Sequence, residues 1–337
     1  MTSSAVNPRS VVVTGADGFI GRHVCTALAR DGWKVRGVVR SSGPGELPGV
    51  ERFVVSDLVD RMGMRAALEG ASAVVHLAAR VHASSQGAGD AAMECRRVNV
   101  DGTALLLDES VAAGVKSLVF ASSVKAVANE SDRELTEETP PQPADPYGES
   151  KLEAERLIRV TATRESLHAP ILRLPNVYGP GMKANMVMLF KAVEKGIPLP
   201  FGSVHNRRSF AYIDNVTAAI LLLLTSPAAA RATVYVSDEE DLSTPELIAH
   251  ISRALGRPSR LVNVPSGLLH GMAGIWGLLS RFPPFHLNGD SLTAMLGSLF
   301  VDTSRLRETT GYRPPMSVEK GMLRTAEWFN SRSQVMS

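Results

Sequence analysis

The stretch Thr14-Gly15-Ala16-Asp17-Gly18-Phe19-Ile20-Gly21 follows the apolar run Val11-Val12-Val13 and opens a helical pattern. A strand that turns sharply into a helix leaves backbone N–H groups unpaired at the positive end of the helix dipole, where phosphate can bind. Gly15 permits the tight turn, Gly18 leaves room for a pyrophosphate, and Gly21 lets the helix pack closely on the strand. The spacing is G-x-x-G-x-x-G, and the stretch predicts a nucleotide-phosphate site.

Apolar strands alternate with helices along the first half of the chain. Asp31-Gly32 ends the first helix, and the spacing of apolar residues then changes to that of a strand. Right-handed crossovers between such strands produce a parallel sheet covered on both faces. We therefore predict an α/β fold with a doubly wound parallel sheet. The further strands expected are Lys34–Val39, Arg52–Val55, Ala73–Ala78 and Ser117–Ala121, with clear helices at Asp60–Leu68 and Val98–Ala113.

Beyond Lys151 the alternation loosens, and Pro and Gly residues cluster at 175–181 and 196–202. Loop-rich segments on an α/β scaffold commonly build the substrate pocket at the carboxyl ends of the strands. An apolar run at 268–282 has helical spacing and is interpreted as a lid or core helix, with a membrane surface or a docked partner as alternatives. The expected division is a dinucleotide-binding domain over 1–174, to which 208–235 return, and a smaller α/β substrate domain made of 175–207 and 236–330.

Composition limits the class of protein. The 337 residues are 44% hydrophobic and 21% charged, enough for a sizeable core, and the net charge of +2 does not indicate nucleic-acid binding. Cys25 and Cys95 have neither a disulfide framework nor metal-ligand spacing, so no metal is expected. Residues 1–10 lack the apolar segment of a signal peptide, and no run reaches the roughly 20 apolar residues of a membrane span. We expect a cytoplasmic enzyme.

Tyr147 and Lys151 stand one turn apart on an expected helix and share a face. A nearby ammonium stabilises a phenolate, so we expect Lys151 to make Tyr147 a usable acid or base near neutral pH. Ser122 and Ser123 follow the fifth strand, at the sheet edge where doubly wound proteins bind ligands. A hydroxyl there can hydrogen-bond a reacting alcohol or carbonyl oxygen. His76 is interpreted as a packed strand residue.

With the glycine turn, the serine pair and Tyr147/Lys151 in this order, the chain resembles the extended short-chain dehydrogenase/reductase superfamily over nearly its whole length. The resemblance is to the nucleotide-sugar epimerase, dehydratase and reductase branch. It implies that Ser123, Tyr147 and Lys151 form the catalytic group, with Tyr147 exchanging a proton with a sugar hydroxyl or ketone while hydride moves to or from a nicotinamide. The cofactor contacts that it implies are Gly15, Gly18, Phe19, Ile20, Gly21, Asp57, Leu58, Leu77, Ala78, Ala79, Asn99, Tyr147, Lys151 and Pro175.

The same resemblance implies a UDP-sugar as the partner molecule. Asn176 lies in a turn whose asparagine faces the substrate in this branch, and Arg207 matches an arginine that holds the nucleoside diphosphate. A guanidinium pairs bidentately with phosphate oxygens, so we expect Arg207 to be the phosphate ligand. The substrate contacts implied are Ser123, Lys125, Asn176, Asn185, Pro200 and Arg207.

Two positions distinguish the reactions of this branch. Its dehydratases carry an Asp-Glu pair directly after the active-site hydroxyl, where this chain has Val124-Lys125, and this difference argues against dehydration. NAD-preferring enzymes place a carboxylate at the end of the second strand. Here Val39 is followed by Arg40, which can receive a 2′-phosphate, so the sequence favours NADP(H), with NAD(H) as the alternative.

These features favour an NADPH-dependent reductase of the C4 ketone of a UDP-4-keto-6-deoxy-N-acetylhexosamine, acting in surface polysaccharide synthesis. A NAD-dependent UDP-sugar 4-epimerase is the alternative. A third interpretation is a non-catalytic cofactor sensor, although such proteins typically lose the Tyr or the Lys that this chain retains. The resemblance also implies a homodimer formed through the helices at 98–113 and 147–164.

Overall fold

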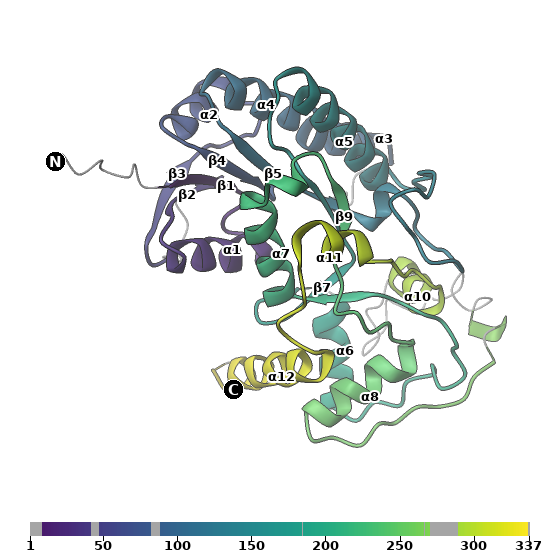
Figure 1. Ribbon diagram of the computed structural model, residues 1–337. Coiled ribbons are helices and arrows are strands. Elements are labelled where there is room, and N and C mark those ends of the chain that lie inside the picture. The colour runs from purple at the N-terminus through teal and green to yellow at the C-terminus, as the bar shows by residue number, and fades with distance from the viewer. Residues whose placement is uncertain are drawn as a thin grey trace.

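The computed structural model describes residues 9–41, 47–81, 88–183, 185–265, 267–269 and 289–335. Its centre is a parallel sheet of seven strands in the order β3-β2-β1-β4-β5-β6-β9 (Figure 1). The order reverses between β1 and β4, and doubly wound sheets bind ligands at such a switch point. The predicted α/β fold is confirmed. The strands are β1 (Ser10–Thr14), β2 (Lys34–Val39), β3 (Val50–Val54), β4 (Ala73–His76), β5 (Ser117–Ser123), β6 (Ile171–Leu174) and β9 (Thr233–Tyr235).

Helices cover both faces of the sheet because successive strand residues point to opposite sides. Val11 and Val13 of β1 pack in one apolar cluster with α1 and α7, whereas Val12 packs in another with α2, α4 and α5. Figure 1 shows these two helical layers on either side of the strands. The helices of the layers are α1 (Phe19–Arg30) and α7 (Ile213–Thr225) on one face, and α2 (Arg61–Leu68), α4 (Gly102–Ala112) and α5 (Pro146–Arg164) on the other.

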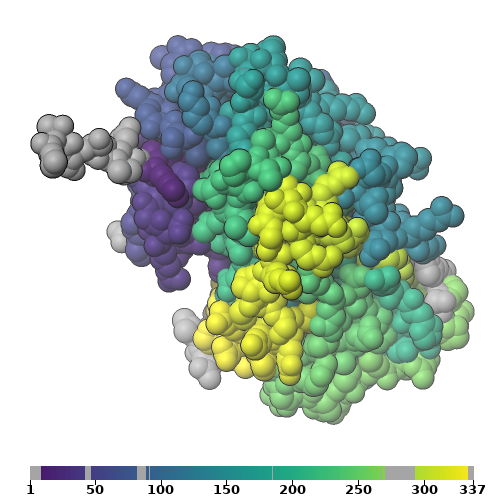
Figure 2. All heavy atoms as spheres, viewed as in Figure 1, coloured from purple at the N-terminus to yellow at the C-terminus, as the bar shows by residue number. Residues whose placement is uncertain are grey.

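A second apolar core lies apart from the sheet and includes Tyr178, Phe190, Phe201 and Phe329. Two short parallel strands, β7 (Asn176–Tyr178) and β8 (Phe210–Tyr212), border it. Figure 2 shows C-terminal residues, in yellow, on the surface beside the green segments of this part. The remaining elements are α3 (Ala88–Arg96), η1 (Arg97–Asp101), η2 (Val124–Ala126), α6 (Asn185–Glu194), η3 (Pro227–Ala229), α8 (Thr244–Ala254), α10 (Gly289–Leu296), α11 (Ser304–Thr310) and α12 (Val318–Val335).

The segment from α7 to β9 returns to the sheet after the chain has built β7, α6 and β8. β9 pairs in parallel with β6, and α7 packs against α1. The apolar run at 268–282 lies outside the described residues except at 268 and 269, where Leu269 is buried in the second core. None of the helices in the described part of the chain is long and apolar enough to cross a membrane.

Candidate active site

The glycine turn between β1 and α1 is packed tightly against the end of β4. Gly15 has a φ of +71°, and a Cβ placed on it would lie 2.9 Å from the amide nitrogen of Ala78. A Cβ on Gly21 would lie 2.1 Å from the Gly15 oxygen. Gly18 is the N-cap residue of α1, so no side chain occupies the backbone N–H groups at the helix start, and the first turn carries no acidic residue. These features suit a diphosphate, because the helix start keeps its positive character.

The space in front of Gly18 gives a test of this assignment. A Cβ on Gly18 has a single neighbour within 4 Å, the Gly15 oxygen at 3.1 Å, so the protein itself nearly accommodates Gly18→Ala. The added methyl group would occupy the place of the diphosphate. We expect a dissociation constant for the dinucleotide that is about tenfold higher or more, with a similar melting temperature. Fluorescence titration and thermal unfolding measure both.

Gly89→Ala is the matched control, since none of the described atoms lies within 4 Å of a Cβ at that position of α3. An unchanged dinucleotide affinity in Gly18→Ala would remove the diphosphate from this turn.

His76 is buried at the end of β4 and links three segments around the glycine turn. Thr103 donates its hydroxyl to the Asn99 carbonyl (2.6 Å), so it accepts from Nε2 of His76 (2.9 Å), and Nδ1 then accepts from Thr14 (2.7 Å). This network assigns the ring proton to Nε2. Burial and the positive charge of Lys151 lower the pKa of His76 to about 3. The ring is neutral, which confirms its interpretation as a packed strand residue.

Asn99 braces the loop after β4 against α5. Its Oδ1 accepts from the Arg80 amide (2.7 Å), and its Nδ2 donates to the Arg80 carbonyl (3.0 Å) and to Ser150 Oγ (2.8 Å). Ser150 in turn donates to the carbonyl of Tyr147 (2.7 Å). Asn99 lies in the π-helical turn η1, whereas the sequence predicted a regular helix over 98–113. The structure therefore differs from the prediction by one wider, π-helical turn, and such turns occur often at functional sites.

Ser123, Tyr147 and Lys151 come from two adjacent elements. Ser123 is the last residue of β5, and Tyr147 and Lys151 lie on the first two turns of α5, which packs against that strand. Asp145 caps α5 by accepting from the Gly148 amide (2.7 Å). The helix carrying Tyr147 therefore starts from a fixed point beside the end of β5.

Lys125, in η2, lies at the same place as these residues, where the end of β5 meets the start of α5; we call this place the Ser123–Tyr147 corner. Its ammonium lies 2.7 Å from Asp145 Oδ2, which also accepts from Asn129 (2.9 Å). Burial alone would raise the pKa of Asp145, but its hydrogen bonds, chiefly those from Lys125 and Gly148, hold that pKa below its ordinary value. The side chain of Lys125 is 45% exposed, so its remaining donors are open to a ligand.

The pKa values of Tyr147 and Lys151 are shifted in directions that the sequence analysis did not predict. Desolvation raises the pKa of Tyr147 to about 12, although a hydrogen bond from Ser123 opposes the rise. Burial lowers the pKa of Lys151 to about 7, and the charge of Glu155 opposes this fall. The ammonium lies 4.2 Å from the centre of the Phe120 ring. Removal of water is the largest cause of the shift of the Tyr147 pKa, and that shift runs upward, against the expected direction. The role of Lys151 in activating Tyr147 stays a prediction.

The other predicted cofactor residues follow the carboxyl ends of the strands. Asp57 accepts from the Val59 amide (3.2 Å) and pairs with Arg97 of η1 (2.5 Å), a partner that the sequence analysis missed. Leu58 packs against Gly102 at the start of α4. The positions are Gly15, Gly18, Phe19, Ile20 and Gly21 after β1, Arg40 after β2, Asp57 and Leu58 after β3, Leu77, Ala78 and Ala79 after β4, and Pro175 after β6.

The predicted substrate residues outside this corner lie on the second part of the chain. Asn176 is exposed at the start of β7, Asn185 begins α6, and Pro200 lies in the turn after Leu199, whose backbone pairs with Leu261. These are the elements that border the second core. These three residues therefore lie on the part of the chain around the second core, whereas Ser123 and Tyr147 lie on the sheet and on α5.

Arg207 does not offer a free charge to a phosphate. Its guanidinium lies 2.9 Å from Asp241 and 3.9 Å from Glu134, and it stacks 4.2 Å from the centre of the Phe300 ring. The cavity of about 280 Å³ that it lines is also bordered by the carboxylates of Glu239 and Asp302 and by the guanidinium of Arg307. Carboxylates outnumber guanidinium groups there, which disfavours an anion. The assignment of the phosphate to Arg207 stays a prediction, and it would require the ion pair with Asp241 to open.

Arg208 points to the other side of the same segment, as successive residues of an extended chain do. Its side chain is buried and donates to the Gly297 carbonyl (2.8 Å), and the described part of the chain gives it no ion pair. Burial lowers the pKa of Arg208, and the charge of Glu130 opposes this. A buried guanidinium that forms no ion pair among the described residues is suited to a bound anion. The sequence analysis did not consider Arg208, because two adjacent arginines cannot be told apart without their burial.

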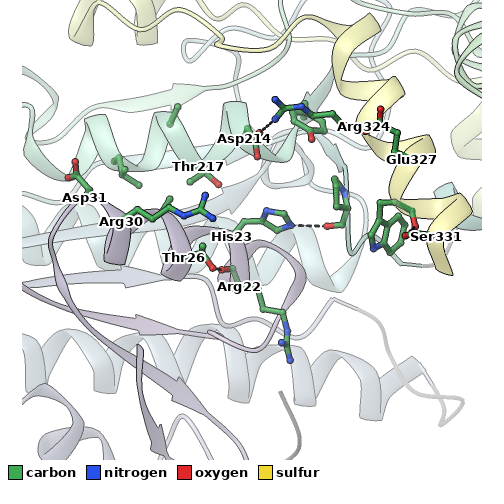
Figure 3. Close-up of a pocket in the computed structure, with 16 residues that line it drawn as sticks. Arg22, His23, Thr26, Arg30, Asp31, Asp214, Thr217, Arg324, Glu327 and Ser331 are labelled. Atoms are coloured by element: carbon green, nitrogen blue, oxygen red, sulfur yellow. Dashed lines mark hydrogen bonds and ion pairs between the residues drawn. The ribbon is translucent and has the colours of Figure 1, made fainter. Parts of the chain in front are cut away.

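A separate cavity of about 1130 Å³ lies between α1, α7 and α12 (Figure 3). His23 of α1 approaches the Pro180 carbonyl (2.8 Å), and Arg324 of α12 pairs with Asp214 of α7 (3.2 Å). None of the described residues that line it is a predicted site residue. The contact of His23 joins α1 to the loop that follows β7.

The fold and the arrangement of this site are those of a nucleotide-binding α/β enzyme family, which sequence comparison identifies. The pattern of the NAD dependent epimerase/dehydratase family matches residues 11–236, and the chain belongs to this family, within the extended short-chain dehydrogenases/reductases. It is 33% identical to a UDP-glucose 4-epimerase of Vibrio cholerae over 96% of both chains. Two solved structures also resemble it, each with a TM-score of 0.75: MoeE5 in complex with UDP-glucuronic acid and NAD (27% identity, 96% and 99% of the two chains covered) and the UDP-glucose 4-epimerase of Thermus thermophilus with NAD (26%, 95% and 99%).

Proposed function

We propose that the chain is a nucleotide-sugar oxidoreductase that reduces the C4 ketone of a UDP-4-keto-6-deoxy-N-acetylhexosamine with NADPH. The observation that carries the proposal is the corner where Ser123, Tyr147 and Lys151 lie beside the carboxyl edge of the sheet, in line with the glycine turn. A nicotinamide dinucleotide bound along that edge would supply the hydride. The sugar nucleotides in complexes of related proteins support the substrate class.

Tyr147 is in the protonation state that a ketone reduction requires. With its pKa raised to about 12, the phenol is protonated at neutral pH and can give its proton to the C4 oxygen as negative charge develops there. The Ser123 hydroxyl can donate a hydrogen bond to the same oxygen, and preformed donors of this kind stabilise a developing oxyanion. Reduction needs this direction of proton transfer, as does the second half of an epimerase cycle.

The position after Ser123 favours reduction over dehydration. Val124 is buried in an apolar cluster with Val127 and Leu135, and Lys125 is tied to Asp145. Elimination of water from a sugar needs an acid and a base directly beside the ring. Here the place of the expected carboxylate pair holds an apolar side chain and a cation.

The end of β2 supports NADP(H) as the cofactor. Val39 is buried, and the next residue, Arg40, is exposed at the edge of the sheet. A guanidinium at this place can receive a 2′-phosphate, and the sequence has Val39 at the strand position where NAD-preferring enzymes carry a carboxylate. NAD(H) is the alternative, because both solved relatives described above contain NAD.

A UDP-sugar 4-epimerase is the second candidate, and the similarity to the Vibrio cholerae 4-epimerase over 96% of both chains favours it. Such an enzyme would first use Tyr147 as a base, then return the hydride to the other face of the sugar. The two candidates therefore differ in whether cofactor is consumed.

For the diphosphate of the substrate we propose Arg208 in place of Arg207, together with Asn176, Asn185 and Pro200. Arg208 is supported by its burial and by the lack of a carboxylate partner in the described residues. Lys125 would contact the sugar from η2, since its ammonium is half-exposed beside Asp145 at the start of α5.

One assay separates the candidates. If the chain is a reductase, the purified protein oxidises NADPH only when the 4-keto UDP-sugar is present, at one NADPH for each sugar reduced. An epimerase instead interconverts UDP-GlcNAc and UDP-GalNAc with no net change in the absorbance of the cofactor. NADPH consumption that does not respond to the keto sugar, without interconversion of the two UDP-sugars, would refute both. Parallel titrations with NADPH and NADH measure the preference attributed to Arg40.

A further inference from the structure

The side chain of Glu155 is buried one helical turn after Lys151, and it joins α5 to two strands. Its Oε1 accepts from the Ser122 hydroxyl (2.6 Å) and from Nε of Arg173 (2.9 Å), and its Oε2 accepts from Nη2 of Arg173 (2.9 Å). Ser122 directly precedes Ser123 on β5, and Arg173 stands two residues before Pro175 on β6. One carboxylate thus connects the helix that carries Tyr147 and Lys151 to both adjacent strands.

The same network reaches the edge of the sheet. Arg173 is 2% exposed and donates from Nη1 to the Tyr235 hydroxyl on β9 (3.0 Å). On the outer side, Arg159 donates to Oε2 of Glu155 (2.7 Å) from a side chain that is 42% exposed. Burial alone would raise the pKa of Glu155, but its hydrogen bonds and ion pairs, first those with Arg173, hold that pKa below its ordinary value. Glu155 therefore keeps its charge in the interior.

We propose that Glu155 is a positioning residue for the proposed active site: its carboxylate fixes α5 against β5 and β6, and it supplies the negative charge opposite the Lys151 ammonium. This inference rests on the proposed function for the role of Lys151. It assigns Glu155 an action through Tyr147 and Lys151, with no contact to substrate or cofactor.

The surroundings of Lys151 make Glu155 its electrostatic counterpart. The described groups near the ammonium are the Phe120 ring of β5, at 4.2 Å from its centre, the neutral His76 of β4, and Glu155 of α5, which is itself paired with Arg173 of β6. Among these described groups, Glu155 carries the negative charge. Because an opposite charge nearby favours the charged form, its removal should lower the pKa of Lys151 by about one unit or more.

The direction of this change in the pKa of Lys151 can be measured through the pH dependence of dinucleotide binding. Lys151 carries three donors in its ammonium form, and the form is lost as the pH rises through its pKa, about 7 in the wild type. Dinucleotide affinity should therefore fall as the pH rises through that value. With Glu155→Gln, which removes the charge and keeps the size, the same fall should occur about one pH unit lower or more.

The experiment compares Glu155→Gln with Glu109→Gln. Glu109 is also a buried carboxylate bound by arginines, Arg61 and Arg65, but it lies in the contact between α2 and α4, away from the proposed site. Dinucleotide dissociation constants are measured from pH 5 to pH 9 for the wild type and both variants, and melting temperatures are recorded beside them. We expect a shifted midpoint in Glu155→Gln and an unchanged midpoint in Glu109→Gln.

Removal of Glu155 leaves Arg173 buried without an anion, which can prevent folding. The double variant Glu155→Gln with Arg173→Met removes both charges and serves if the single variant does not fold; because the lost cation offsets part of the lost anion, its midpoint should shift in the same direction by a smaller amount. A folded variant with the wild-type midpoint and only a lower melting temperature would overturn the proposal. The titration uses NADPH without any sugar, so an error in the proposed substrate does not change it.

Discussion

Replacing Tyr147 with Phe should lower kcat by about 10²- to 10⁴-fold, the range that a positioned general acid contributes. The phenyl ring preserves the packing at the start of α5, and the lost hydroxyl is the group that would protonate the C4 oxygen. Dinucleotide affinity should stay close to that of the wild type, because the fold of the glycine turn and Lys151 are untouched. Steady-state kinetics with the 4-keto UDP-sugar and a dinucleotide titration measure both quantities.

Tyr178→Phe is the matched control for this variant. Tyr178 is also buried, and its hydroxyl donates to Asp238 (2.8 Å) in the second core. Its loss should cost about 1–3 kcal/mol of stability, the cost of leaving a buried acceptor unpaired, without a comparable loss of turnover. Turnover that survives in Tyr147→Phe would remove Tyr147 from the chemistry and revive the non-catalytic interpretation.

Replacing Arg208 with Ala should raise KM for the UDP-sugar by about 30-fold or more, since truncating one partner of a buried charge pair costs about 2 kcal/mol at least. Arg207→Ala should change KM little, because that guanidinium is exposed and already paired with Asp241. The two variants differ by one position and remove the same charge, so each serves as the control for the other. Initial rates over a range of sugar concentrations at saturating cofactor give both values.

Dinucleotide affinity should be the same in both arginine variants. A larger KM increase in Arg207→Ala than in Arg208→Ala would restore the assignment made from the sequence and show that the ion pair of Arg207 opens for the substrate.

The sheet was predictable where its strands are buried on both faces. Continuous apolar runs such as 11–13 and 73–75 stand out from their flanking turns. Strand β2 has the bounds that the sequence predicted, although Lys34 and Arg36 interrupt its apolar residues. Strands β7, β8 and β9 have three residues each, too few for a pattern, and pairing with distant segments defines them. The π-helical turn η1 was missed for a related reason, since contacts of Asn99 with the β4 loop and α5 hold it.

The position of the proposed catalytic residues was predictable from order and spacing, because Ser123 ends a strand and Tyr147 and Lys151 lie one turn apart on a helix. Their catalytic roles stay predictions. Their charges were not predictable, since desolvation decides them and depends on residues far apart in the chain. The network of Glu155 illustrates this, as its members come from four elements. The domain division, the preference for NADP(H), the homodimer and the cytoplasmic location stay predictions.

The late arrival of β9 has a consequence for the order of synthesis. The ribosome completes Ser123, Tyr147 and Lys151 long before it reaches Tyr235, whose hydroxyl closes the hydrogen-bond network behind them. α7, which covers one face of the sheet, is likewise made after β7 and β8. A nascent chain that ends before residue 213 therefore holds the proposed catalytic side chains but leaves exposed the part of the sheet face that α7 covers beside α1. Competence for turnover should appear during translation only after β9 has emerged.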